Sequence, residues 1–74
     1  MPTAPTSELR RVFALRVREQ RKRLHISQEE LADRAQVHRT FIGAVERAET
    51  NVSIDNIARI SAALVVEAWE LLKE

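Results

Sequence analysis

Apolar residues recur every three to four positions along most of this chain, which is the period of amphipathic helices. The clearest example is the segment 27–49, where two such stripes flank residues 36–38. Ser27 followed three residues later by Glu30 is typical of a capping box that opens a helix. The stripe positions are Leu31, Ala32 and Ala35 in the first half and Ile42, Val45 and Glu46 in the second. This pattern predicts two short helices joined by a tight turn.

The same period predicts a longer helix ahead of that segment. Ser7 is expected to cap a first helix over residues 7–24, after a flexible tail of residues 1–6. His25 stands where helices often end in a left-handed residue, so we interpret it as a helix terminator before a ligand or a pH switch. Ile26 should enter the core. The inward positions of this helix are Leu9, Phe13, Val17 and Leu24, with Val12 or Gln20 between them.

Two further elements are predicted after the central segment. A polar loop over residues 48–52 should lead to a fourth helix capped by Ser53. Val65 and Val66 then connect to a short last helix over residues 67–73. The expected buried positions of the fourth helix are Ile54, Ile57, Ile60, Ala63 and Leu64, and the last helix holds the apolar residues Trp69, Leu71 and Leu72.

Composition narrows the class of protein. One glycine, and two prolines confined to the first five residues, favour an all-α fold, a compact five-helix domain over residues 7–74. The absence of cysteine excludes disulfides and thiolate chemistry and suits a reducing cytoplasm. No apolar run approaches the roughly 20 residues that span a membrane, and no stretch of signal-peptide type begins the sequence. We therefore expect a cytoplasmic protein with no membrane partner.

The central pair of helices has a recognisable size. Two helices of about eight residues joined by a turn of three to four have the dimensions of a helix-turn-helix, which presents its second helix to the major groove of double-stranded DNA. Charge supports this interpretation. Residues 1–23 carry seven Arg and Lys against two Glu, a net of +5, although the whole chain sums to only +1. An Arg-rich helix alone is more often a solvated face, but beside this motif it favours contact with phosphates.

In this arrangement the chain resembles the phage-repressor family of helix-turn-helix proteins, also called the xenobiotic-response-element type, over about residues 9–72. The resemblance rests on Arg21, ISQEELA (26–32), Val37, Ile42, VER (45–47) and SIDNIARISAAL (53–64). The segments 38–42 and 46–53 are most similar to the controller proteins of restriction–modification systems. The resemblance implies a lambda-repressor-like fold and a homodimer that regulates its own operon and the endonuclease gene.

Four positions depart from the family pattern. His25, Ala48 and Val65 stand where the family usually has glycine, which concerns the geometry of the loops after three helices. Thr50 stands where controller relatives can carry a basic residue, so one contact to phosphate or groove is expected to be absent there.

The first turn of the second motif helix should meet the base edges. Arg39 can donate two parallel hydrogen bonds to guanine, and Thr40 offers a hydroxyl and a methyl group. Phe41 either makes an apolar contact near the dimer axis, where base steps deform easily, or packs in the core. The predicted base contacts are Arg39, Thr40, Phe41 and Ala44.

Other residues are predicted to hold the DNA backbone. Gln28 begins the first motif helix, where its amide and the backbone N–H groups suit a phosphate, and the resemblance supports this contact. The resemblance also implies a buried ion pair between Arg21 and Glu46, with Arg21 structural or supporting a phosphate contact. Ser53 is interpreted as a cap before a contact. The predicted backbone contacts are Gln28, His38, Arg47, Asn51 and Arg21.

Two surfaces concern protein partners. One short helix reads few base pairs, so we expect a dimer on an inverted repeat. Its predicted interface is Val65, Val66, Trp69 and Leu72, although Trp69 could instead close the core. Glu29, Glu30 and Asp33 should form an acidic outward patch. This patch is either a solvated face or, by resemblance to phage repressors, a contact for the σ subunit of RNA polymerase.

The sequence offers little support for other classes of function. Neither histidine has a second ligand at metal spacing, and the acidic residues are not paired. We therefore expect no enzyme activity, metal, cofactor or small-molecule ligand. The alternatives among DNA-binding proteins are a phage-type repressor and an antitoxin regulator. The alternative outside that class is a helical protein-interaction module, against which the exposed Arg39 and Thr40 and the basic first helix argue.

Overall fold

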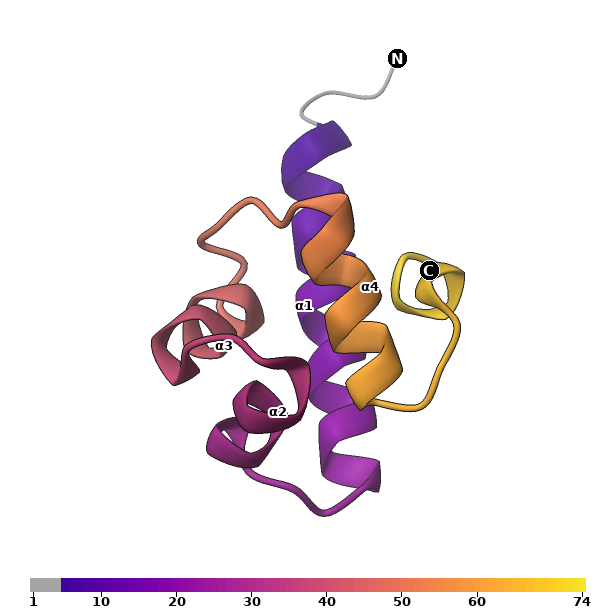
Figure 1. Ribbon diagram of the computed structural model, residues 1–74. Coiled ribbons are helices and arrows are strands. Elements are labelled where there is room, and N and C mark those ends of the chain that lie inside the picture. The colour runs from indigo at the N-terminus through magenta and orange to yellow at the C-terminus, as the bar shows by residue number, and fades with distance from the viewer. Residues whose placement is uncertain (1–4) are drawn as a thin grey trace.

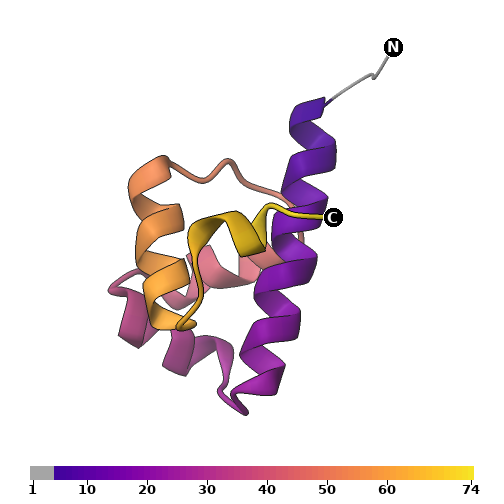
Figure 2. The same cartoon turned by 90° about the vertical axis from the view of Figure 1, so that its right-hand side faces the viewer.

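The computed structural model describes residues 5–74 and is built from helices. Its elements are α1 (Pro5–Arg23), α2 (Gln28–Ala35), α3 (Arg39–Glu46), α4 (Ile54–Ala63) and the 3₁₀ helix η1 (Ala68–Leu71). Figure 1 shows α2 and α3 on one side of the long α1 and the C-terminal segment on the other. In the quarter-turn view of Figure 2, η1 lies between α1 and α4, and it packs against both. The C-terminal segment therefore closes the space between the first and fourth helices.

The predicted fifth α-helix over residues 67–73 is wrong. The segment forms a single 3₁₀ turn, so the described residues contain four α-helices. The backbone N–H of Glu67 donates to the Glu70 carboxylate at 2.9 Å, which stabilises the start of this turn. One turn is enough to bring Leu71 into the core. A longer helix is not needed to bury this residue.

Serine side chains open two of the helices, as predicted. The Ser27 hydroxyl accepts a hydrogen bond from the backbone N–H of Glu30 at 3.0 Å, and Ser53 accepts one from Asn56 at 3.1 Å. The Glu30 carboxylate instead accepts a hydrogen bond from Arg34 at 3.0 Å. Of the two hydrogen bonds of the capping box predicted at α2, we therefore find only the one that the Ser27 hydroxyl accepts.

The start of α1 differs from the prediction. The helix begins at Pro5, a residue whose fixed φ and missing N–H suit the first helical position. Ser7 therefore lies inside the helix and is not its cap. Residues 1–4 of the expected tail lie outside the described residues.

All four α-helices end in a left-handed residue that is not glycine. His25, Gln36, Ala48 and Val65 have φ values of 57°, 61°, 60° and 61°. At the end of α1, Ile26 N–H donates to the Arg21 carbonyl and His25 N–H to the Lys22 carbonyl, which is the Schellman pattern. The same pair of bonds closes α2, α3 and α4. The three residues that stand where the family pattern has glycine therefore still adopt the left-handed conformation that a Schellman cap requires.

The core lies where α1, α2, α3, α4 and η1 meet. Its members include Phe13, Val17, Leu31, Ile42, Val45, Ile60, Leu64 and Leu71. Two residues predicted to be buried are exposed instead: Leu9 is 50% exposed and Ile54 83%. Ile54 is the first residue of α4. No helix in the described part of the chain is long and apolar enough to cross a membrane.

Candidate nucleic-acid interface

The first turn of α3 presents the side chains that the sequence assigned to base contact. Arg39 and Thr40 are exposed, whereas the opposite face of the helix buries Ile42 and Val45. His38 is the N-cap residue, with extended backbone angles, and its side chain makes no capping hydrogen bond. The first N–H groups of α3 are therefore not capped by that side chain and can face an anion.

Two alternative roles were proposed for Phe41, an apolar contact with DNA and packing in the core. Its ring is partly buried and packs against the core, so much of its apolar surface is already used. Ala44, one turn further along α3, is also partly buried. The fully exposed side chains of the first turn are thus Arg39 and Thr40, and base recognition would rest mainly on them.

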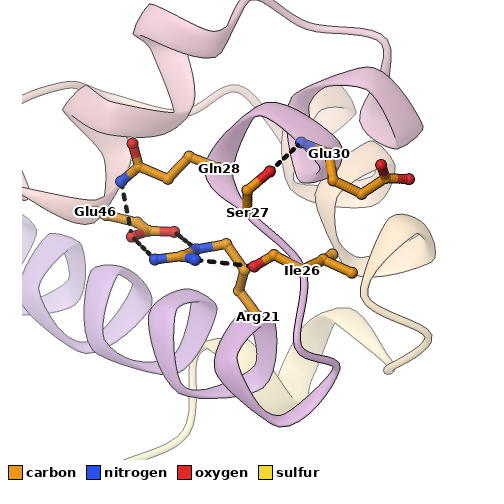
Figure 3. A network of polar contacts seen from close by, with 6 residues as sticks. All are labelled: Arg21, Ile26, Ser27, Gln28, Glu30 and Glu46. Atoms are coloured by element: carbon orange, nitrogen blue, oxygen red, sulfur yellow. Dashed lines mark hydrogen bonds and ion pairs between the residues drawn. The ribbon is translucent and has the colours of Figure 1, made fainter.

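A buried ion pair fixes the position of α3, and Figure 3 shows its surroundings. Arg21 Nε donates to Glu46 Oε2 at 2.7 Å and Arg21 Nη2 to Glu46 Oε1 at 3.0 Å. The side chains are 13% and 3% exposed. The hydrogen bonds that Arg21 donates to Glu46 raise the pKa of Arg21 above its already high value, against the opposing effect of burial. This is the pair expected from the resemblance, and it joins the last turn of α1 to the end of α3.

The pair is extended by two further contacts. Arg21 Nη1 donates to the Ile26 carbonyl at 3.0 Å, and Gln28 Nε2 donates to Glu46 Oε1 at 3.0 Å. One carboxylate therefore holds the first residue of α2 and the last turn of α1 at the same time. Each of the three guanidinium nitrogens of Arg21 donates one hydrogen bond inside the protein, so its main role is support of the motif, and its contact with the DNA backbone stays a prediction. Gln28 retains one amide hydrogen and the N–H groups of the α2 terminus for a phosphate.

Gly43 is a site residue that the sequence interpretation missed. A Cβ atom placed on it would lie 3.2 Å from Nη1 of Arg47 and 3.7 Å from Oε1 of Gln28. The absence of a side chain at this buried position thus lets Arg47 fold back over α3 toward Gln28, and both residues were predicted to bind phosphates. A lone glycine inside a helical pattern is the local signal that would have drawn attention to it.

The loop after α3 carries the other predicted backbone contacts. Arg47 is exposed, and its Nε donates to Glu49 Oε1 at 2.9 Å. Such an exposed pair is weak, so a phosphate can replace the glutamate as the partner of Arg47. Asn51 is exposed and its Oδ1 accepts a hydrogen bond from Val52 N–H at 3.1 Å, which shapes the loop.

The predicted acidic patch on α2 is exposed but partly neutralised. Glu30 pairs with Arg34 at 3.0 Å on the same helix. Glu29 and Asp33 are also exposed. Arg34 was not considered in the sequence interpretation, although its i, i+4 spacing from Glu30 is a recognised pairing distance. The net acidic character of this face therefore depends mainly on Glu29 and Asp33.

The C-terminal segment exposes an apolar surface. Val65 is 77% exposed and Trp69 58%, while Val66 and Leu72 are partly buried. Trp69 does not close the core, because Leu71 takes that place. The ammonium group of Lys73 lies 5.6 Å from the centre of the Trp69 ring, and Arg16 of α1 donates to the Lys73 carbonyl at 2.9 Å.

No group of three or more His, Asp or Glu residues in the described ranges is placed to hold a metal ion.

Comparison with known proteins agrees with this geometry. The Helix-turn-helix family model matches residues 17–67, which is more than half of the chain. The chain belongs to the helix-turn-helix family. Control protein C.BamHI of Bacillus amyloliquefaciens is 44% identical over 68 residues, covering 90% of this chain and 84% of the relative. The chain is thus similar to restriction–modification control proteins, within a family of DNA-binding transcription regulators and not of enzymes.

Solved structures show the same fold. The restriction–modification controller protein C.AhdI from Aeromonas hydrophila superimposes with a TM-score of 0.81 at 40% identity, covering 84% of this chain and 94% of that one. The hypothetical transcription factor NHTF from Neisseria gives a TM-score of 0.86 at 43% identity, covering 88% and 75%. The helix-turn-helix and its supporting helices are therefore shared across these proteins.

Proposed function

We propose that this protein is a homodimeric, sequence-specific DNA-binding regulator of a restriction–modification operon. In this role it would bind an inverted repeat upstream of its own gene, limit its own expression and activate expression of the endonuclease. The similarity to control proteins supports the biological context. The geometry of α2 and α3 supports the proposed binding of DNA bases and phosphates.

The observation that carries the proposal is the exposed first turn of α3 beside a rigid support. Arg39 and Thr40 point out of the fold, and the Arg21–Glu46–Gln28 network holds α3 against α1 and α2. Because Arg39 offers a planar fork of donors, it fits the O6 and N7 atoms of guanine. Gln28, Arg47 and the free N–H groups at the two helix starts would bind flanking phosphates.

A dimer would use the surface of the C-terminal segment. Val65 and Trp69 offer exposed apolar area at its centre, with Val66 and Leu72 beside them. Charged side chains of both signs border this area, including Arg16, Glu19 and Glu70. An apolar centre with a polar rim is the usual composition of a self-complementary interface.

The test is a mobility-shift titration on the DNA upstream of the protein's own gene, repeated over a range of salt concentrations. We expect specific binding to weaken steeply with salt, and to exceed binding to random DNA of equal length. Arg47→Ala should weaken binding to both DNAs and flatten the salt slope by about one unit, because one phosphate contact is lost. Arg59→Ala, an exposed arginine on α4, is the matched control. Absence of any DNA binding by the folded protein would instead favour a protein-interaction module.

A further inference from the structure

A pocket of about 250 Å³ is lined by the N-terminal half of α1, the end of α3, the loop that leads into α4, α4 itself and the C-terminal segment. Most of its lining is apolar: Leu9 and Phe13 come from α1, Val45 from α3, Val52 from the loop, Ile57 from α4 and Leu72 from the C-terminus. The loop also contributes the polar Thr50 and Asn51, and Asn51 is a predicted contact to the DNA backbone. Segments far apart in the sequence thus enclose one apolar space.

One charged side chain belongs to this lining. The Nε atom of Arg10 is buried and has no hydrogen-bond partner among the described residues. An arginine is always charged and donates five hydrogen bonds in a planar fork. A buried donor of this kind that makes no bond costs free energy, since its water has been removed without replacement. Arg10 therefore places a positive charge at the lining of a mostly apolar pocket, and one of its donors, Nε, makes no hydrogen bond to a described residue.

We propose that this pocket binds a small amphipathic carboxylate, with its acid group on Arg10 and its hydrocarbon part against Leu9, Phe13, Ile57 and Leu72. The planar guanidinium matches the two oxygens of a carboxylate. A single arginine in a mostly apolar lining suits one negative charge better than the two charges of a phosphate monoester. The volume lies near the lower end of ligand pockets, about 300–1,000 Å³, so the occupant is a small acid. This site replaces the expectation that the protein has no small-molecule ligand.

The first experiment needs no DNA, so its outcome is independent of the proposed function. Octanoate is titrated into the ¹³C-methyl-labelled full-length protein, and the methyl resonances of Leu9, Val52, Ile57 and Leu72 are followed by NMR. 1-Octanol and octylamine serve as a neutral and a cationic probe of the same chain length. We expect saturable shifts of these methyl groups with octanoate, and binding about tenfold or more weaker for the other two probes, since they lose the charge-assisted hydrogen bonds.

Variants then assign the selectivity to one residue. Arg10→Gln should remove the preference for octanoate over 1-octanol. Arg10→Lys should keep only part of it, because the charge remains and the fork is lost. Arg11→Gln removes the same charge from the next, exposed residue, which does not line the pocket, and should leave octanoate binding unchanged within about twofold. Circular dichroism melting of each variant confirms that it is folded.

Three results would overturn the proposal. One is the absence of methyl shifts at millimolar octanoate in the folded wild-type protein. Another is equal binding of all three probes, which would reduce the pocket to a nonspecific apolar surface. The third is a set of methyl shifts that depends on protein concentration and not on octanoate, which would assign the pocket to a second copy of the chain.

Discussion

Arg39 is the residue on which sequence recognition should depend most. It is exposed in the first turn of α3, next to Thr40, while Phe41 is partly taken up by the core. Arg39→Ala should lower operator affinity by about 1–3 kcal/mol and relax discrimination at one base position. Binding to a panel of operators with single base changes measures this directly, and Arg59→Ala is again the control. Equal weakening on specific and random DNA would reassign Arg39 to a phosphate.

The surroundings of Gly43 allow a prediction about the free energy of unfolding. Alanine is the better helix former by about 0.8–1.0 kcal/mol, and the obstacle to a Cβ atom here is the end of the Arg47 side chain at 3.2 Å. Because Arg47 is exposed and flexible, it can move by a few tenths of an ångström. Gly43→Ala should therefore raise the free energy of unfolding by about 0.5 kcal/mol. Urea denaturation tests it, and a loss of stability would show that Arg47 and Gln28 are held rigidly at this point.

At the scale of helices, the four C-terminal caps are the most unusual feature. A left-handed conformation costs about 1–2 kcal/mol for residues other than glycine. Ala48→Gly should therefore stabilise the protein by about 0.5–1 kcal/mol, after allowance for the greater freedom of glycine in the unfolded chain. Ala58→Gly, the same change at an exposed position inside α4, should destabilise it by a similar amount. Urea denaturation that shows the same sign for both variants would contradict the strain at Ala48.

The elements differ in how far the sequence determines them. Ser27 and Ser53 mark the starts of α2 and α4, because a cap is a local hydrogen bond and leaves a local pattern. The last helix was predicted too long, because an apolar period over seven residues does not distinguish one 3₁₀ turn from a helix. The exposure of Ile54 depends on where the start of α4 lies relative to the other helices. A local sequence pattern does not indicate that position.

The residues of the site also differ in how far the sequence predicts them, because some of them depend on contacts between distant parts of the chain. Arg21 and Glu46 are 25 residues apart in the chain, and the resemblance to a family, not their spacing, indicated their pairing. The pocket around Arg10 is formed by α1, the end of α3, the loop, α4 and the C-terminus, so no single segment predicts it. By contrast Arg39 and Thr40 were found from their place in the first turn of a helix, which is a local property.

At the scale of the whole molecule, dimerisation should depend on the C-terminal surface. Trp69→Ala and Val66→Asp should each give a folded monomer that binds DNA much more weakly, because apolar area is lost or a charge enters the interface. Ile54→Ala removes an even more exposed apolar side chain at the far end of α4, about 15 Å away along the helix, and should remain dimeric. Sedimentation at micromolar concentration distinguishes these outcomes. A dimeric, folded Val66→Asp protein would place the interface elsewhere.

Activation of transcription is the last property of the whole molecule to test. Glu29 and Asp33 are exposed on α2, and DNA phosphates would repel them, so they do not serve DNA binding. Part of their role is structural, since Glu29 lies in the first turn of α2 and favours the helix dipole there. If the patch also contacts the σ subunit of RNA polymerase, Glu29→Lys with Asp33→Lys should abolish activation while operator affinity stays equal or rises slightly.

The control for that double variant must change the charge by the same amount at another place. Glu8→Lys with Asp55→Lys does so at two exposed positions outside α2 and outside the C-terminal surface. It should leave activation intact, because long-range charge effects are screened beyond about 8–10 Å. In vitro transcription with purified polymerase measures activation, and footprinting in the same buffer measures operator occupancy. Unchanged transcription from the regulated promoter in the α2 variant, at full occupancy, would show that the acidic patch is only a solvated face of α2.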